Sequence, residues 1–193
     1  MALPARSFVA ALLLVVLTSA CAEAQEQGQA QDPSRSAQRL RRSTRTDTVR
    51  DTARTTCVVE HVTDGDTIRC QGGRRVRLLL IDTPELDQGS FGRTAAETLR
   101  RLAPVGTSLR MEFDVQRTDR YDRTLAYLWT ARGEMLNEQM VREGMAVVLV
   151  YPPNVKYVER LRTAADLAQR RKIGLWATSA FECAPRDHRA GRC

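Results

Sequence analysis

The chain has 193 residues and a formal net charge of +7 at pH 7, with 42% hydrophobic residues. This is enough for one domain with a sizeable core plus extra segments, and not for a series of large domains. All but two of its 30 basic residues are arginines. Either a genome-wide codon preference or a polyanionic partner would explain this, so the charge alone names no partner.

Residues 1–21 read as an export signal. One arginine precedes the apolar run VAALLLVVLTSA, which ends in small residues and is shorter than the roughly 20 apolar residues that span a bilayer. Cleavage after Ala20 would leave Cys21 for lipid attachment, because TSAC is similar to a bacterial lipoprotein signal. Cleavage after Ala22 is the alternative. In both cases we expect the mature protein to work outside the cytoplasm, secreted or lipid-anchored to the membrane.

Residues 22–56 consist largely of Gln, Arg, Ser, Thr and Asp. Such a segment cannot bury enough apolar surface to offset the entropy of ordering it. We therefore predict a disordered linker ahead of a folded domain at residues 57–177, with a C-terminal tail at residues 178–193.

The folded domain opens with strand signals. The segments CVVEHVT and TIRC flank DGD, a strong hairpin turn. The stretch RLLLIDTPE, Arg77 to Glu85, then combines a continuous apolar run with an abrupt polar end. The run predicts one strand buried on both faces, which Pro84 stops. Two carboxylates would lie at the rim of that strand.

Helix and strand signals then alternate to the end of the domain. Thr94–Glu97 forms a capping box that predicts the start of a helix. SLRMEFDV and LAYLWT read as strands, EMLNEQMVRE as a short helix ended by Gly144, and the segment after YPPN as a longer amphipathic helix closed by Gly174. About five strands and three helices in this order predict an α+β fold with an OB-type barrel.

The cysteines indicate disulfides. If Cys21 is removed or acylated, four remain, an even number for an exported chain. Cys57 and Cys70 flank the predicted hairpin, and Cys183 and Cys193 bracket a short polar tail. We choose this local pairing among the three available. Zinc is the rival interpretation, but the cysteine spacings do not suit it.

The hairpin turn and the end of the third strand bring acids together. If the second and third strands are adjacent, Asp64 and Asp66 approach Asp82 and Glu85. Four such carboxylates repel one another unless something positive holds them ionised. A hard cation such as calcium, bound by oxygen ligands, would do so. The arginines Arg77 and Arg123 are the other candidates. Taken alone, DGDT is better explained as a simple turn.

Taken together, the motifs DGDT, RLLLIDTPE, QRTDRYDRTLAYLW and GEMLNEQMVREGMA, followed by Trp176, resemble the staphylococcal nuclease (thermonuclease) family. The resemblance runs from about Val58 to Trp176. It implies an OB-fold barrel with packed helices. It also implies a calcium-dependent phosphodiesterase that cleaves DNA and RNA and leaves 3′-phosphate ends.

The resemblance assigns roles to the acids. Asp66 and Asp82 match calcium-binding carboxylates, and Thr83 matches a residue that offers its backbone carbonyl. Glu85 matches the acid that activates or orients the attacking water. Asp64 aligns with an acid behind the metal ligands.

The resemblance also assigns substrate contacts, to Arg77 and Arg123 at the scissile phosphate and to Arg120, Tyr121 and Tyr151 at the nucleotide. This places paired guanidinium groups opposite the acids, across a gap the width of a phosphate. Leu149 replaces a second pocket tyrosine of the family, and the segment 86–93 is shorter and less basic than the family's prototype loop. We expect a monomer that acts on DNA and RNA. The alternative is a catalytically inactive module of the same fold that binds nucleic acid or protein.

Overall fold

The computed structural model describes residues 55–193. The predicted signal peptide, Cys21 and nearly all of the predicted linker lie outside the described residues. Within the described range, no helix combines the length and the apolar character needed to cross a membrane.

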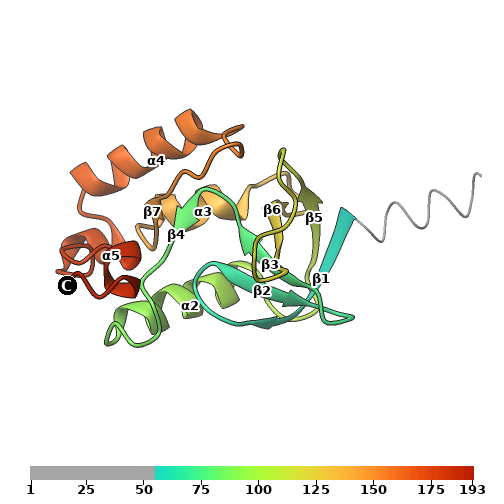
Figure 1. Ribbon diagram of the computed structural model, residues 1–193, viewed down its shortest axis with the longest axis horizontal. Helices are drawn as coiled ribbons and strands as arrows, with labels where there is room; N and C mark the ends of the chain where they lie inside the picture. Colours follow the sequence, from blue (N-terminus) through green and yellow to red (C-terminus); the bar gives the residue numbers. More distant parts are fainter. Residues whose placement is uncertain (1–54) are drawn as a thin grey trace, which may run out of the picture. The chain divides into compact units, whose positions relative to one another are not determined.

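Five strands close into a barrel in the order β1-β2-β3-β6-β5 (Figure 1). All neighbouring pairs are antiparallel except β3 and β6, which run parallel. The barrel with its packed helices confirms the predicted α+β OB-type fold. The barrel strands are β1 (Thr56–Val62), β2 (Thr67–Cys70), β3 (Arg75–Leu78), β5 (Ser108–Glu112) and β6 (Thr124–Trp129).

Both predicted disulfides are present. Cys57 and Cys70 join the outer ends of the β1–β2 hairpin, with their Cα atoms 5.2 Å apart. Both are almost completely buried, so this bridge belongs to the core. Cys183 and Cys193 close a ten-residue separation in the C-terminal tail.

Helices cover the barrel and build the remaining core. Helix α3 contacts α2, α4 and strand β6, so it lies at the centre of the helical layer (Figure 1). A short sheet of two antiparallel strands, β4 and β7, contacts α4 through β7. These elements are α2 (Phe91–Leu102), α3 (Leu136–Arg142), α4 (Val158–Arg170), α5 (Pro185–Arg189), the 3-10 helix η1 (Gly174–Ala177), β4 (Ile81–Asp82) and β7 (Val147–Val148).

The apolar run after Arg77 is not one strand, so that prediction was wrong. Strand β3 ends at Leu78, the chain turns at Leu79 and Leu80, and β4 begins at Ile81. Leu80 has a φ of 64°, which a leucine adopts only where the surroundings hold it. The four apolar residues from Leu78 to Ile81 are all buried. A turn buried in this way gives the same continuous apolar sequence as a buried strand, which is why the sequence pattern could not distinguish them.

Two predicted helix boundaries also shift. Helix α2 begins at Phe91 rather than at Thr94, whose hydroxyl donates back to the carbonyl of Ser90 instead of capping the helix. Helix α4 ends at Arg170, before Gly174. Gly174 opens η1, where an added Cβ would lie 2.2 Å from the carbonyl oxygen of Glu143, so close packing explains this glycine.

Candidate active site

The predicted site residues meet at one cavity of about 1030 Å³. Its walls come from the β1–β2 turn, the chain from β3 to the segment just after β4, the loop before β6, the segment after β7 and Arg189 of α5. Asp82 lies behind the wall and contributes no lining. The predicted residues that line the cavity are Asp64, Asp66, Arg77, Thr83, Glu85, Arg120, Tyr121, Arg123 and Tyr151.

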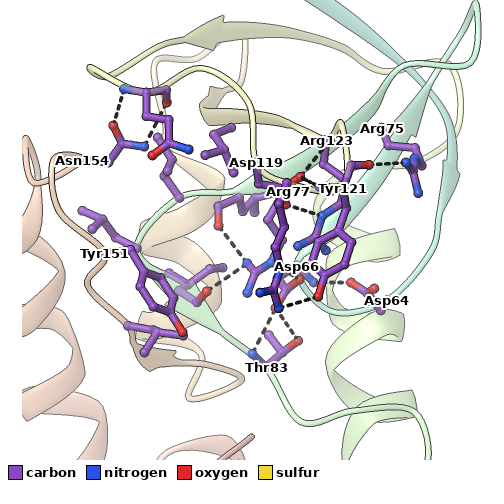
Figure 2. A pocket seen from close by; sticks show the side chains of 18 of the residues that line it. Asp64, Asp66, Arg75, Arg77, Thr83, Asp119, Tyr121, Arg123, Tyr151 and Asn154 are labelled. Carbon is purple, nitrogen blue, oxygen red and sulfur yellow. Dashed lines mark hydrogen bonds and ion pairs between the residues drawn. The ribbon is translucent and has the colours of Figure 1, made fainter. Parts of the chain in front are cut away.

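Asp66 is fixed by the turn between β1 and β2. Its own N–H donates to Asp64 Oδ1 at 3.0 Å, and its Oδ2 accepts from both the N–H and the hydroxyl of Thr83, each at 3.2 Å (Figure 2). Gly65 permits this approach, because an added Cβ would lie 2.6 Å from Thr83 Oγ1 and 2.8 Å from Ala95 Cβ. The turn therefore binds the start of the segment after β4 directly.

Arg77 joins the two carboxylates that the resemblance assigns to calcium. Its Nε lies 2.9 Å from Asp66 Oδ1, and its Nη2 lies 3.1 Å from Asp82 Oδ1. Its Nη1 donates to the carbonyls of Leu78 and Ile81, both at 2.9 Å, and so spans the turn between β3 and β4. The predicted gap between this guanidinium and the acids is absent, since Arg77 lies directly on them.

Asp82 is completely buried, and both of its oxygens are occupied. Oδ1 accepts from Arg77, and Oδ2 accepts from Arg189 Nη2 at 2.9 Å. Burial raises the pKa of Asp82 above its usual range, although both guanidinium groups act in the opposite direction. Burial, together with the charge of Asp66, raises the pKa of Asp64 to about 6.

Glu85 lies at the rim of the cavity and is partly exposed. Its Oε1 accepts from Arg189 Nη1, and its N–H donates to Gln88 Oε1 at 2.8 Å. Partial burial alone would lower the pKa of Arg189, but its hydrogen bonds to Asp82 and Glu85 outweigh this and raise it. The carboxylate predicted to handle the attacking water is thus bound to a cation from the far end of the chain.

Arg123 is oriented by Asp119. Asp119 Oδ2 accepts from Arg123 Nε at 2.7 Å, and its Oδ1 accepts from the N–H groups of Tyr121 and Arg123, both at 2.9 Å. The guanidinium carbon of Arg123 lies 5.4 Å from the centre of the Tyr121 ring, within cation–π range. One carboxylate therefore shapes the loop and aims its arginine.

Exposed aromatic faces lie on opposite sides of the cavity. Tyr121 receives a hydrogen bond from Arg120 Nη2 at its hydroxyl, and Arg75 Nη2 donates to its carbonyl, both at 2.6 Å. Tyr151 extends from the segment after β7 (Figure 2). Leu149 also lines the cavity, so the substitution noted in the sequence falls within the site.

Sequence reasoning missed Asp119, Arg75 and Arg189. The repeated Asp and Arg in QRTDRYDR could have revealed Asp119, because an Asp side chain commonly bonds to backbone N–H groups two residues on. Arg75 stands two positions before Arg77 on the same strand and so on the same face. No local signal identifies Arg189, which lies 107 positions after Asp82.

The oxygen donors of Asp66, Asp82 and Thr83 suit a hard divalent cation. Among residues 55–193, no group of three Asp, Glu, His or Cys side chains is arranged to hold a metal ion. Two carboxylates would therefore need the Thr83 carbonyl and water to complete a calcium site. In this structure the carboxylate oxygens of Asp66 and Asp82 contact guanidinium groups, and Asp66 also accepts from the N–H and hydroxyl of Thr83.

Comparison with known proteins agrees with this geometry. Residues 75–178 match the family model described as "Staphylococcal nuclease homologue". The thermonuclease of Staphylococcus hyicus is 38% identical over 130 residues, covering 63% of this chain and 76% of that protein. The thermonuclease of Staphylococcus intermedius is 35% identical over 127 residues, covering 62% of this chain and 74% of that protein. Endonuclease YncB of Bacillus subtilis (strain 168) is 35% identical over 133 residues, covering 64% of this chain and 62% of that protein. The chain therefore belongs to the staphylococcal nuclease family and is a nuclease.

Proposed function

We propose that this nuclease depends on calcium and hydrolyses phosphodiester bonds of DNA and RNA, leaving 3′-phosphate ends. The observation that carries the proposal is the convergence of Asp66 and Asp82 on one guanidinium, at 2.9 and 3.1 Å, beside a cavity that also holds Glu85 and Arg123. Acids and arginines from separate segments of the chain are thereby gathered at one cavity, where they can act on a charged substrate. The names of the relatives, thermonuclease and endonuclease, support the nuclease activity on which this proposal builds.

The carboxylates of Asp66 and Asp82 and the carbonyl of Thr83 would hold the calcium ion. Bound there, the ion would supply Lewis-acid stabilisation of charge on phosphate oxygens. The buried and hydrogen-bonded setting of Asp66 fixes one carboxylate before any ion arrives, which reduces the ordering that binding requires.

The substrate would enter along the aromatic and basic wall. Tyr121 and Tyr151 present exposed rings on which a base can stack, a contact that tolerates any sequence. Arg123, already aimed by Asp119, would donate to the scissile phosphate. Donors held in place before reaction stabilise developing charge without reorganisation, and one such donor contributes about 2.7–4 kcal/mol.

Glu85 would accept the proton of the attacking water. Its carboxylate lies at the open edge of the cavity, where a water molecule can approach it. Its backbone is fixed by Gln88, which limits how far the side chain can move.

The experiment is digestion of single- and double-stranded DNA and of RNA by the purified protein, with calcium or with excess chelator. We expect cleavage only with calcium. Because a 3′-phosphate blocks ligation, the products should be ligated at their 3′ ends to a 5′-phosphorylated strand only after phosphatase treatment. Glu85→Gln should lower the rate by 100-fold or more, on the order of the general-base effect. Asp122→Asn, an exposed loop change, is the control. Undiminished cleavage in chelator would overturn the calcium assignment.

We also propose that the protein is exported, with residues 1–21 removed and residues 22–56 forming a tether to the domain at 57–177. The apolar run before Cys21 supports export. Mass spectrometry of the mature N-terminus distinguishes the two cleavage sites. A lipid-modified Cys21 supports anchoring, and a chain that starts at Glu23 supports free secretion. Light scattering of the purified protein tests whether it is a monomer, as we expect.

A further inference from the structure

We propose that the C-terminal tail acts as an internal competitor for the metal, with the guanidinium of Arg189 occupying the carboxylate oxygens that a cation must reach. This inference rests on the calcium site of the proposed function. It concerns a residue outside the part of the chain that matches the family model, which ends at residue 178.

The contacts of Arg189 are directed at the site alone. Its Nη2 lies 2.9 Å from Asp82 Oδ2, and its Nη1 bonds to Glu85 Oε1. Its side chain has no other hydrogen-bond partner within residues 55–193. A two-pronged guanidinium thus bridges a proposed calcium ligand and the proposed base.

The tail is built to hold this arginine in place. The disulfide Cys183–Cys193 closes a loop around α5, and Gln88 Nε2 donates to the carbonyl of Cys183 at 3.3 Å. His188 Nε2 lies 3.0 Å from Asp87 Oδ1. Both anchors grip the segment that follows Glu85. Covalent closure restricts the positions open to Arg189, so its contact with the acids is maintained by the loop.

The base of the tail packs against the hydrophobic core, with Ala180 inside it and Phe181 on its border. The rings of Phe181 and Trp176 lie 4.4 Å apart between centres, and Ala180 and Pro185 are buried. In Figure 1, α5 lies beside the segment between β4 and α2. The tail therefore forms part of the folded domain.

Access to Asp82 requires one guanidinium to move. The Asp82 side chain has no exposed surface, Arg77 takes one oxygen and Arg189 takes the other. Arg77 is 13% exposed and also holds two backbone carbonyls of the β3–β4 turn. Arg189 is 39% exposed and holds no backbone group. Arg189 is therefore the group that gives way to an entering cation.

This competition has a measurable consequence. Without Arg189 a calcium ion no longer displaces a guanidinium from Asp82 and Glu85, so calcium binding should become tighter. For a partly exposed ion pair we expect a decrease in Kd of about fivefold in Arg189→Gln. A residue that only stabilised the fold would leave calcium affinity unchanged or weaken it.

The test is calorimetric titration of calcium chloride into chelator-stripped protein, without nucleic acid. Four forms are compared: wild type, Arg189→Gln, Arg189→Lys and Arg186→Gln. Arg186 is exposed on the same helix, so Arg186→Gln removes the same charge as Arg189→Gln but leaves the contacts with Asp82 and Glu85 in place. We expect a lower Kd for Arg189→Gln, near wild-type values for Arg189→Lys, and no change for Arg186→Gln.

A double Cys183→Ser, Cys193→Ser variant provides a second route that leaves Arg189 in the chain. Opening the loop should also lower the calcium Kd, and the melting temperature in chelator should fall more than in calcium.

An unchanged or higher Kd in both Arg189→Gln and the double serine variant would overturn the competition. Equal tightening by Arg186→Gln would show a general charge effect and also overturn it. If neither wild type nor Arg189→Gln binds calcium, the proposed calcium site itself is wrong and the competition fails with it. Binding only in Arg189→Gln would support a tail that blocks the site fully.

Discussion

Asp119 holds Arg123 at two points, its side-chain Nε at 2.7 Å and its backbone N–H at 2.9 Å. The carboxylate thereby sets both the course of the loop and the direction of the guanidinium. Asp119 is partly buried, which alone would raise its pKa, but hydrogen bonds from Arg123 and Tyr121 outweigh this and lower the pKa. The arginine of the proposed phosphate site is therefore aimed before substrate binds.

We predict that Asp119→Asn lowers nuclease activity by about 10- to 100-fold, the range expected when a catalytic group is misplaced by about 1 Å. An asparagine can keep the backbone bonds through its oxygen, but its amide would face Arg123 Nε as donor against donor. The measurement is kcat and KM on a defined DNA substrate, with thermal unfolding to confirm the fold.

Asp122→Asn is the matched control, since it makes the same change three positions on at an exposed residue. Its activity should equal that of wild type. Full activity in Asp119→Asn would show that Arg123 needs no orientation by this carboxylate.

The close approach of the DGD turn to Thr83 gives a second prediction. In Gly65→Ala the new Cβ would lie 2.6 Å from Thr83 Oγ1, so the turn must move away and Asp66 loses its bonds to Thr83. Overpacking of this kind costs about 1–3 kcal/mol. We expect that loss in urea unfolding, together with weaker calcium binding.

Gly72→Ala separates crowding from backbone strain. No atom lies within 4 Å of its added Cβ, but its φ of 81° is unfavourable for alanine. This variant should lose about 1–2 kcal/mol through backbone strain and keep its calcium affinity. Equal losses of calcium affinity in the two variants would contradict the steric explanation.

The sequence predicts the barrel, the disulfides and the meeting of the acids because each has a signal in the residues around it; the roles of the remaining site residues come from the family resemblance. The hairpin follows from DGD between alternating strands, and the acids at positions 66 and 82 follow from the two strand ends. The disulfides follow from the positions of the cysteines at the borders of these elements. Each signal depends on neighbouring residues.

The features that sequence reasoning missed depend on distant partners. The turn at Leu79 and Leu80 is held by Arg77 and by Asn137, which lies 58 positions from Leu79. A run of four apolar residues cannot reveal those bonds. Arg189 reaches its carboxylates only through the folding of the tail, so its role cannot be read from PRDHR.

Acid sensitivity of the fold should include a contribution from Asp114. Its oxygens accept from the Tyr127 hydroxyl at 2.9 Å, the Lys156 N–H at 3.0 Å and the Val115 N–H at 2.9 Å. Partial burial acts to raise the pKa of Asp114, but these bonds outweigh it and hold the pKa below its usual 3.8. A lowered pKa in the folded state means stability that is present above pH 3.8 and lost as pH falls through the folded-state pKa.

We therefore predict that Asp114→Asn lowers the free energy of unfolding at pH 7 by about 1 kcal/mol, the usual size for one partly exposed charged hydrogen-bonding group. The difference from wild type should shrink below pH 3.8, where the wild-type carboxylate also becomes protonated. Urea unfolding between pH 2.5 and 7 measures it. A constant difference across that range would exclude the ionised form of Asp114 as its source.

Asn137 supports the last prediction, because it is a polar residue with no exposed surface that connects three parts of the fold. Its Nδ2 donates to the carbonyl of Leu79 at 2.9 Å, and its Oδ1 accepts from the Leu128 N–H at 3.0 Å. It therefore joins α3 to strand β6 and to the turn that redirects the chain toward Asp82.

Asn137→Ala leaves two buried backbone groups without partners, each costing about 1–3 kcal/mol, so we expect a loss of about 2–4 kcal/mol in urea unfolding. Asn137→Asp has nearly the same shape and tests the chemistry alone. The aspartate can still accept from the Leu128 N–H, but its second oxygen faces the Leu79 carbonyl oxygen and the two repel each other. Above pH 6 the Asn137→Asp variant should therefore be no more stable than the alanine variant. Because the same turn positions Asp82, calcium affinity should fall with stability in both variants. A loss below 1 kcal/mol in both would mean that the turn at Leu79 and Leu80 is held by Arg77 alone.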